Sequence, residues 1–129
     1  LSCAVANAVI ESIDDSKTLE RISYVSERIR CGLYQLKDKY EVIGDIRGVG
    51  MLYGVEMVEN SESKIPATRI TTEVIRNCLG KGIIFLSGAL PYNNVIILSP
   101  TYLLTNDQIG YVISALDSAI SETLRMEDK

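Results

Sequence analysis

The apolar residues of this chain change their spacing near Tyr40, from the period of a helix to the period of a strand. Before that point they recur at helical intervals within a charged background, at Leu19, Ile22, Ile29, Leu33 and Leu36. Residues 51–58 then alternate, with one face made of Met51, Tyr53, Val55 and Met57. The same change from helical to strand spacing occurs again after residue 79. The chain therefore alternates between helices and short pairs of strands.

The expected elements follow from these changes of period and from the breakers between them. In chain order they are helices over residues 1–13 and 16–40, strands over 41–46 and 51–58, a helix over 70–79, strands over 82–87 and 95–99, and a helix over 105–124. Ser16 is the expected cap of the second helix, Gly80 and Gly82 close the third, and residues 125–129 are expected to fray. The order ααββαββα predicts an α+β fold with a small, largely antiparallel sheet covered on one face by helices.

The last helix has the clearest start signal in the chain. Thr105 and Gln108 have the spacing of a capping box, and Leu104 and Ile109 can form the hydrophobic staple around it. The apolar face that we expect to pack on the sheet consists of Ile109, Val112, Ile113, Leu116, Ile120 and Leu124. Local sequence therefore predicts both the start of this helix and its buried side.

Length and charge limit the classes of function. The 129 residues, 47% of them apolar, suffice for one core, so residues 1–129 are expected to form a single domain. Thirteen Lys and Arg against seventeen Asp and Glu give a net charge of −4, without a basic stripe, which argues against a nucleic-acid partner. The apolar runs are too short to span a bilayer, and a signal-peptide layout is missing. We therefore expect a cytoplasmic protein without a membrane partner.

Cysteine and histidine usage excludes several kinds of site. Cys3, Cys31 and Cys78 are far apart and the chain has no histidine, so neither a metal site nor a disulfide framework is expected. The expected role of the cysteines is that of small, buried apolar residues. Without histidine, Ser-His-Asp and Cys-His catalysis are also excluded. Any chemistry of this chain must use Lys, Asp, Glu, Tyr or Arg.

The segment "GDIRGVGMLYGVEMV", from Gly44 to Val58, places three glycines within seven residues. A phosphate-binding loop runs from a strand into a helix, whereas an alternating run follows these glycines, which favours a turn between two strands. Gly48 and Gly50 are expected to supply positive φ in that turn. Gly54, inside the second strand, indicates a close backbone approach or a bulge.

The same segment resembles the D-x-R-G-x-G-hydrophobic-x-G-x-E motif of the class III aminotransferases that depend on pyridoxal phosphate (PLP). This fold type I group includes ω-amino-acid, ornithine and 4-aminobutyrate aminotransferases. Three further pieces resemble the family in the right order: "LSCAVANAVIESID" the helix that opens its small domain, "CLGKGIIFLSG" a helix end followed by a strand, and "NNVIILSPTYLLTNDQI" a strand, a double proline and the closing helix. Together they cover nearly all of the chain, which resembles the C-terminal small domain of such an enzyme.

The resemblance implies that the catalytic residues lie outside this chain. In the family, the Schiff-base lysine, the aspartate at the pyridinium nitrogen and the phosphate-binding loop belong to the large domain, upstream of Leu1. The helical pattern already present at Leu1, without a preceding methionine, agrees with a chain taken from a longer protein. The six lysines occupy contexts typical of solvated surfaces: Lys17, Lys37, Lys39, Lys64, Lys81 and Lys129. We expect the large cofactor-binding domain to be absent and this chain alone to bind no PLP and to be inactive.

Two positions depart from the family pattern. Thr101 stands where the family has the second proline of its double proline. Ile97 stands where many members of the α-family carry an arginine that binds the substrate carboxylate. The second departure argues against ornithine or 4-aminobutyrate as the substrate type and fits the ω-amine and diamine branch better.

The resemblance implies a homodimeric parent enzyme that transfers an amino group from an amine or ω-amino acid to a keto acid. The small domain would form one wall of the substrate cleft and close on it. Turns at sheet ends supply such contacts, so the candidate wall residues are Arg47, Gly48, Gly50, Met51, Ser87, Gly88 and Tyr92. Both turns could instead serve only to reverse the chain, with Arg47 paired to Asp45 or Glu56. The alternative function is a stand-alone α+β module that binds a ligand or another protein.

Overall fold

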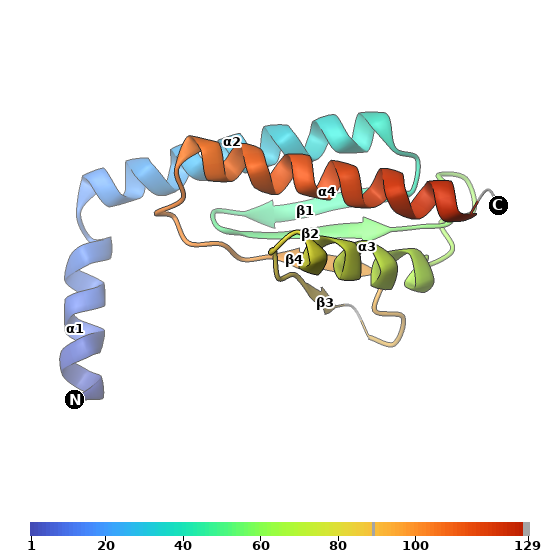
Figure 1. Ribbon diagram of the computed structural model, residues 1–129. Helices are drawn as coiled ribbons and strands as arrows, with labels where there is room; N and C mark the ends of the chain where they lie inside the picture. Colours follow the sequence, from blue (N-terminus) through green and yellow to red (C-terminus); the bar gives the residue numbers. More distant parts are fainter. Residues whose placement is uncertain (89, 128–129) are drawn as a thin grey trace.

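The computed structural model describes residues 1–88 and 90–127 of the chain (Figure 1). In chain order its elements are α1 (Ser2–Ile13), α2 (Ser16–Lys39), β1 (Ile43–Val49), β2 (Leu52–Met57), α3 (Thr68–Gly80), β3 (Leu86–Gly88), β4 (Val95–Leu98) and α4 (Asn106–Glu127). This order confirms the predicted α+β fold and the sequence of elements ααββαββα.

The four strands form one sheet in the order β1-β2-β4-β3, and each neighbouring pair is antiparallel. Strands β2 and β4 pair in the centre although α3 separates them in the chain, with Tyr53 opposite Leu98 and Val55 opposite Ile96. The two hairpins therefore join along their inner strands, which leaves β1 and β3 as the edges.

Helices α2, α3 and α4 lie on one face of the sheet, and the core fills the space between these two layers (Figure 1). The alternation predicted for β2 is confirmed, because Tyr53, Val55 and Met57 are buried while Leu52 is exposed. Helix α1 extends away from the domain and contributes no buried residue (Figure 1). We call the other face of the sheet, away from these three helices, the outer face.

Two strand boundaries differ from the prediction. Strand β1 continues through Arg47 and Gly48 to Val49, because each of these residues pairs with β2, and the turn shrinks to Gly50 and Met51. Strand β3 covers residues 86–88 instead of 82–87, since it pairs with β4 only from Leu86 onward. An apolar run such as residues 83–85 does not reveal by itself whether it finds a strand partner.

Three helix ends also differ from the prediction. Asp15, and not Ser16, caps α2, because its carboxylate accepts a hydrogen bond from the Lys17 amide at 3.3 Å. Gly80 is still helical, and the positive φ that follows α3 belongs to Gly82. Helix α4 continues through residues 125–127, where Glu127 pairs with an arginine of α3, so these residues do not fray. The remaining part of the predicted fraying tail, residues 128–129, lies outside the described residues.

The prediction of buried cysteines is correct for one of the three. Cys78 is buried in α3, and burial raises the pKa of its thiol to about 11. Cys3 and Cys31 are exposed, since α1 has no partner layer and Cys31 faces outward from α2. In α2 most positions are polar, so the helical pattern does not assign Cys31 to either side.

The capping box at the start of α4 is confirmed in both directions. The Thr105 amide donates to Gln108 Oε1 at 2.9 Å, and the Gln108 amide donates to Thr105 Oγ1 at 3.2 Å. The staple residues Leu104 and Ile109 both belong to the hydrophobic cluster at this end of the sheet. Local side chains therefore satisfy backbone donors at the start of the helix.

We expect Thr105→Ala to lower the free energy of unfolding by about 1 kcal/mol, because the Gln108 amide loses its acceptor. Gln108→Ala should cost less, since the Thr105 amide remains accessible to water. Urea denaturation of both single variants and of the double variant measures these losses. Additive losses in the double variant would contradict a reciprocal box, whose two hydrogen bonds support each other.

Candidate functional site

A hollow of about 510 Å³ lies on the outer face of the sheet, over β1 and β2 and beside β4. The strand register explains its position, because Arg47, Gly54 and Ile97 stand side by side on three neighbouring strands. On the same face, the next pair of residues toward the β1–β2 turn is Val49 and Leu52. The lining residues are Arg47, Gly48, Val49, Leu52, Tyr53, Gly54 and Ile97.

The two glycines in this hollow have different roles: Gly54 keeps the outer face low, whereas Gly48 stands opposite the buried Tyr53, so a side chain there would point toward the helical side. A Cβ atom at Gly48 would lie 2.5 Å from Tyr53 Cδ1 and 2.8 Å from Tyr53 Cα, so no larger residue fits without backbone movement. A Cβ atom at Gly54 would lie 3.1 Å from Val95 Cγ1, so the close neighbour of Gly54 is a side chain and not the backbone that was one of the two expectations. Gly54 does not form the bulge that was the alternative expectation for it. The irregularity in the β1–β2 pairing lies at Gly44, between Ile43 and Asp45.

The prediction that both turn glycines have positive φ is correct for one of them. Gly50 has a φ of 58° and open space where a Cβ would point. Gly48 lies within β1 opposite Tyr53, so it is required for space and not for backbone conformation. The sequence could not separate these two reasons, because the second depends on the register with β2.

Arg47 lies at the rim of the hollow and is already paired with two carboxylates. Its Nη2 atom lies 2.8 Å from Glu56 Oε2, and its Nε atom lies 3.3 Å from Asp45 Oδ2. Lys37 approaches the same Asp45 carboxylate at 3.5 Å. Two positive and two negative charges thus form one network, in which the Arg47 side chain stays 66% exposed.

The remainder of the outer face is apolar and exposed. Val49 is 85% exposed, Leu52 57% and Leu86 65%. Leu86 stands beside Ile97 in the register, so the exposed apolar surface continues from the hollow to β3. We call Val49, Leu52, Leu86 and Ile97 the outer apolar row. Sequence reasoning missed its members on β1 and β3, although the alternation had placed Leu52 on this side.

The structure brings together only part of the predicted cleft wall. Gly88 shares the outer face with the hollow, because its Cβ position would meet Ile97 Cδ1 at 2.5 Å. Ser87 stands opposite the buried Ile96 and so points toward the helical side. Met51, at the β1–β2 turn, packs against the core.

The two turns that supply these candidates lie at opposite ends of the sheet (Figure 1). The β1–β2 turn with Gly50 is next to Leu98, at the end of β4, whereas Tyr92 precedes the start of β4 at Val95. About 13 Å of strand separates these ends. Tyr92 is exposed, and its carbonyl accepts a hydrogen bond from Thr68 at the start of α3. One small ligand therefore cannot touch both turns.

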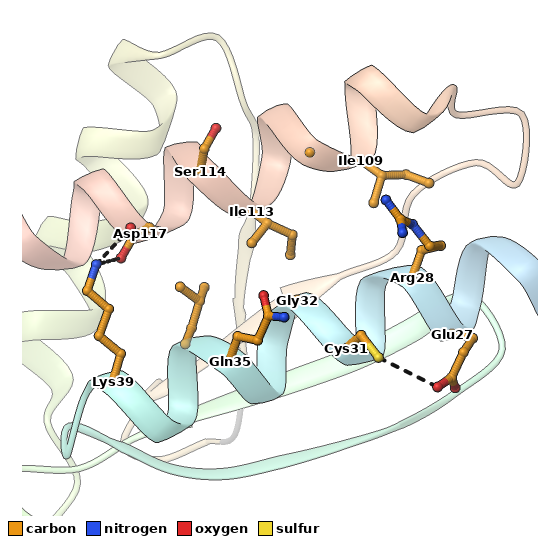
Figure 2. Close-up of a pocket in the computed structure, with 12 residues that line it drawn as sticks. Glu27, Arg28, Cys31, Gly32, Gln35, Lys39, Ile109, Ile113, Ser114 and Asp117 are labelled. Atoms are coloured by element: carbon orange, nitrogen blue, oxygen red, sulfur yellow. Dashed lines mark hydrogen bonds and ion pairs between the residues drawn. The ribbon is translucent and has the colours of Figure 1, made fainter.

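A second hollow, of about 530 Å³, lies between α2 and α4 on the helical side (Figure 2). Glu27, Arg28 and Gln35 line it from α2, and Ser114 and Asp117 line it from α4. Glu27 is bound by Arg30 at 2.7 Å, and Asp117 is bound by Lys39. This groove contains none of the sequence-predicted site residues, and internal ion pairs occupy both of its carboxylates.

The Lys39 pair closes one end of this groove and joins α2 to α4 (Figure 2). Lys39 Nζ lies 2.7 Å and 2.9 Å from the two Asp117 oxygens, and the Tyr40 hydroxyl donates to Asp117 Oδ1 at 2.6 Å. The hydrogen bond from Lys39, and then that from Tyr40, hold the pKa of the Asp117 carboxyl below its ordinary value. The carboxylate is therefore the form that stabilises the fold.

We expect Asp117→Asn to lower the thermal midpoint at pH 7 and to have no effect in strong acid. The Asp117 contribution is present in full above the carboxyl's unfolded pKa, about 4, and is lost as pH falls through the lower folded pKa. Melts from pH 7 to pH 2 measure this difference. Asp38→Asn is the matched control, because Asp38 is an exposed α2 carboxylate with no ion pair to the described residues. Equal effects of the two substitutions at pH 7 would contradict the assignment.

The lysines among the described residues lie at the surface, in contexts like those expected from the sequence. Lys37, Lys39 and Lys81 each pair with a carboxylate at the surface. Lys17 and Lys64 are exposed in a helix and a loop, and Lys129 lies outside the described residues. Within residues 1–88 and 90–127, His, Cys, Asp and Glu form no cluster of three that could hold a metal ion. None of the described helices is both long and apolar enough to cross a membrane.

Comparison with known proteins identifies the relatives of this chain. The family model described as Aminotransferase class-III matches residues 1–120. The chain is 35% identical over 125 residues to the (R)-1-hydroxy-2-aminoethylphosphonate ammonia-lyase of Vibrio splendidus, covering 97% of this chain and 26% of that protein. It is also 35% identical over 100 residues to the 5-aminovalerate aminotransferase DavT of Pseudomonas aeruginosa, covering 78% of this chain and 24% of that protein.

A solved transaminase structure contains the same fold as this chain. The transaminase from the marine bacterium Virgibacillus superposes with a TM-score of 0.84 at 25% identity, over 95% of this chain and 28% of that chain. This chain thus spans about a quarter of the length of the proteins that it matches.

Proposed function

The chain belongs to the class III aminotransferase family, and we propose that it is the C-terminal small domain of a PLP-dependent transaminase. The parent enzyme transfers an amino group from an amine or ω-amino acid to a keto acid, as a homodimer in the cytoplasm. The 129-residue chain alone is inactive, because the groups that hold and use PLP lie in a large domain outside it. The bound cofactor would carry the amino group between the two substrates.

The outer apolar row is the observation that carries this proposal. A sheet face with Val49, Leu52 and Leu86 exposed is unfavourable in water, and large exposed apolar surfaces mark interfaces. Relatives about four times as long supply a candidate partner, the large domain that precedes the small domain in this family. We propose that this domain covers the outer face and that the substrate cleft opens along its edge.

The paired network around Arg47 gives this residue its place in the proposal. Asp45 and Glu56 hold the guanidinium at the rim of the hollow, with its side chain largely exposed. A cation fixed there can bind a substrate carboxylate or a carboxylate of a closing loop, by exchanging one of its present partners. Gly54 and Gly88 leave the neighbouring outer surface low enough for close approach.

The substrate class follows from the family and from the lining of the hollow. One relative is named for 5-aminovalerate, which is an ω-amino acid. Ile97 gives the hollow an apolar side chain on its β4 side, beside Gly54 and in the row that contains Arg47. Ile97 supplies no cation, so Arg47 at the rim is the residue that would bind the acidic end of an ω-amino acid, while the apolar chain of the substrate lies along Ile97.

A second candidate reaction is elimination of ammonia, because one relative that covers 97% of this chain is named as an ammonia-lyase. The two reactions differ in their need for an acceptor. Transfer consumes one keto acid for each amine and releases no ammonia, whereas elimination releases ammonia without a keto acid. We expect the intact enzyme to consume 5-aminovalerate only when pyruvate or another keto acid is present. Ammonia released without a keto acid, from this or another amine, would favour the lyase.

The docking role is tested by placing a charge on the outer apolar row. We expect Leu52→Lys to lower kcat/KM of the intact enzyme at least about tenfold, because an unpaired charge would be buried at the interface. Leu79→Lys is the matched control, since Leu79 is 58% exposed on α3, compared with 57% for Leu52. The isolated chain should keep its thermal midpoint with either change. Equal activity of the two variants would show that the large domain does not cover the outer face.

A further inference from the structure

An apolar crevice of about 140 Å³ lies at the end of β4, between the sheet and the helical layer. Ile29 and Val112 line it from α2 and α4, and Ile83, Phe85 and Leu98 line it from the sheet side. Among the described lining residues, Ser99 alone carries a polar side chain. The lining residues that are exposed to solvent are Ile84 and Ser99, so the crevice opens beside them.

The walls of this crevice are held in place by bonds that do not depend on its contents. Arg21 of α2 donates to the Leu104 carbonyl, and the Tyr24 hydroxyl donates to Asn106 at the start of α4 at 3.1 Å. The capping box of Thr105 then fixes the first turn of α4. Because hydrogen bonds position the surrounding segments, the crevice is preformed in the folded chain.

We propose that this crevice is a binding site for a small neutral apolar molecule, a single-ring aromatic or a short branched hydrocarbon. An enclosed apolar cavity of roughly 150 Å³ stays free of water and binds benzene or xenon. The crevice has nearly the same volume, about 140 Å³, and an apolar lining, so it fits this class of ligand. Water has too few polar partners along the walls to compete. The Phe85 ring offers an aromatic ligand an edge or a face for stacking. A charged or strongly hydrated molecule is excluded, since it would lose its water without replacement.

The crevice is separate from the hollow of the outer face, and the two share none of their lining residues. It lies on the helical side of β4, where Leu98 points into the core. Binding here therefore does not rest on the proposed enzymatic role. Occupancy would join the start of α4 to the end of β4 and would stabilise the folded chain by mass action.

Benzene is the probe, and methyl NMR spectra of the 129-residue chain are the readout. We expect saturable shifts of the methyl signals of Ile83, Leu98 and Val112. The substitution Ile84→Trp should weaken benzene binding at least about tenfold, because a large side chain at the opening covers it. Ile84 is 79% exposed, so this variant should fold. Ile65→Trp is the matched control, because Ile65 is 58% exposed and lies outside the crevice.

A second variant fills the crevice from within. Val112→Phe should remove benzene binding, and its backbone spectrum reports whether the fold is retained. Shifts that do not saturate, or that are equally strong in Ile84→Trp, would overturn the proposal. Shifts that are largest at Val49, Leu52 and Ile97 would also overturn it, because they would place the probe on the outer apolar row.

Discussion

Replacement of Leu116 by alanine is expected to lower the free energy of unfolding by about 3 kcal/mol. Leu116 lies in the middle of α4, has no exposed surface and belongs to the core between this helix and the sheet. Removing its isobutyl group takes away buried contacts and leaves a cavity that rigid neighbours cannot fill. Urea denaturation monitored by circular dichroism measures the loss.

Leu79→Ala is the matched control for this prediction. Leu79 is also a helical leucine, but it is 58% exposed on α3. The control should change stability by no more than about 0.5 kcal/mol, as surface substitutions do. A loss at Leu116 as small as that of the control would contradict the assigned face of α4.

Gly48→Ala is expected to destabilise the chain by about 1 to 3 kcal/mol, because the added methyl group collides with the opposite strand. The nearest atoms include the Leu52 carbonyl oxygen and Tyr53 Cα, which cannot move without distorting the hairpin. Gly50→Ala should cost about 1 kcal/mol, because only its positive φ opposes a side chain. Thermal and urea denaturation of both variants measure the two effects.

Arg47→Ala completes this series and separates folding from function. Its ion pairs are exposed, so its removal should change stability by less than about 0.5 kcal/mol. In the intact enzyme we expect the three substitutions to rank in the opposite order for activity. Arg47→Ala, which changes stability least, should lower kcat/KM most. If Arg47→Ala destabilises the isolated chain as much as Gly48→Ala, the arginine is a structural partner of Asp45 and Glu56, and its functional role fails.

The parts of the fold that were predictable from sequence are those that depend on neighbouring residues. The capping box joins Thr105 and Gln108, which are three residues apart. The alternation of Tyr53, Val55 and Met57 lies within a single strand. Both are confirmed. The same holds for the order of elements, because each change of period is visible within a short window.

The parts that were not predictable depend on pairing between distant segments. The end of β1 at Val49 is set by β2, and the reduced length of β3 is set by β4. The hollow needs Arg47, Gly54 and Ile97 in one row, which the register across three strands produces. No local pattern contains that register, so the candidate wall residues were grouped by turns that lie at opposite ends of the sheet.

The central claim is that this chain is a small domain whose cofactor chemistry belongs to a large domain outside it. Absorbance titration with PLP tests this claim most directly, using the 129-residue chain and the intact enzyme side by side. We predict that the intact enzyme shows the visible band of lysine-bound PLP at a ratio of one to one, and that the chain alone shows none. A one-to-one band from the chain alone would contradict the account, because one of its own lysines would then hold the cofactor.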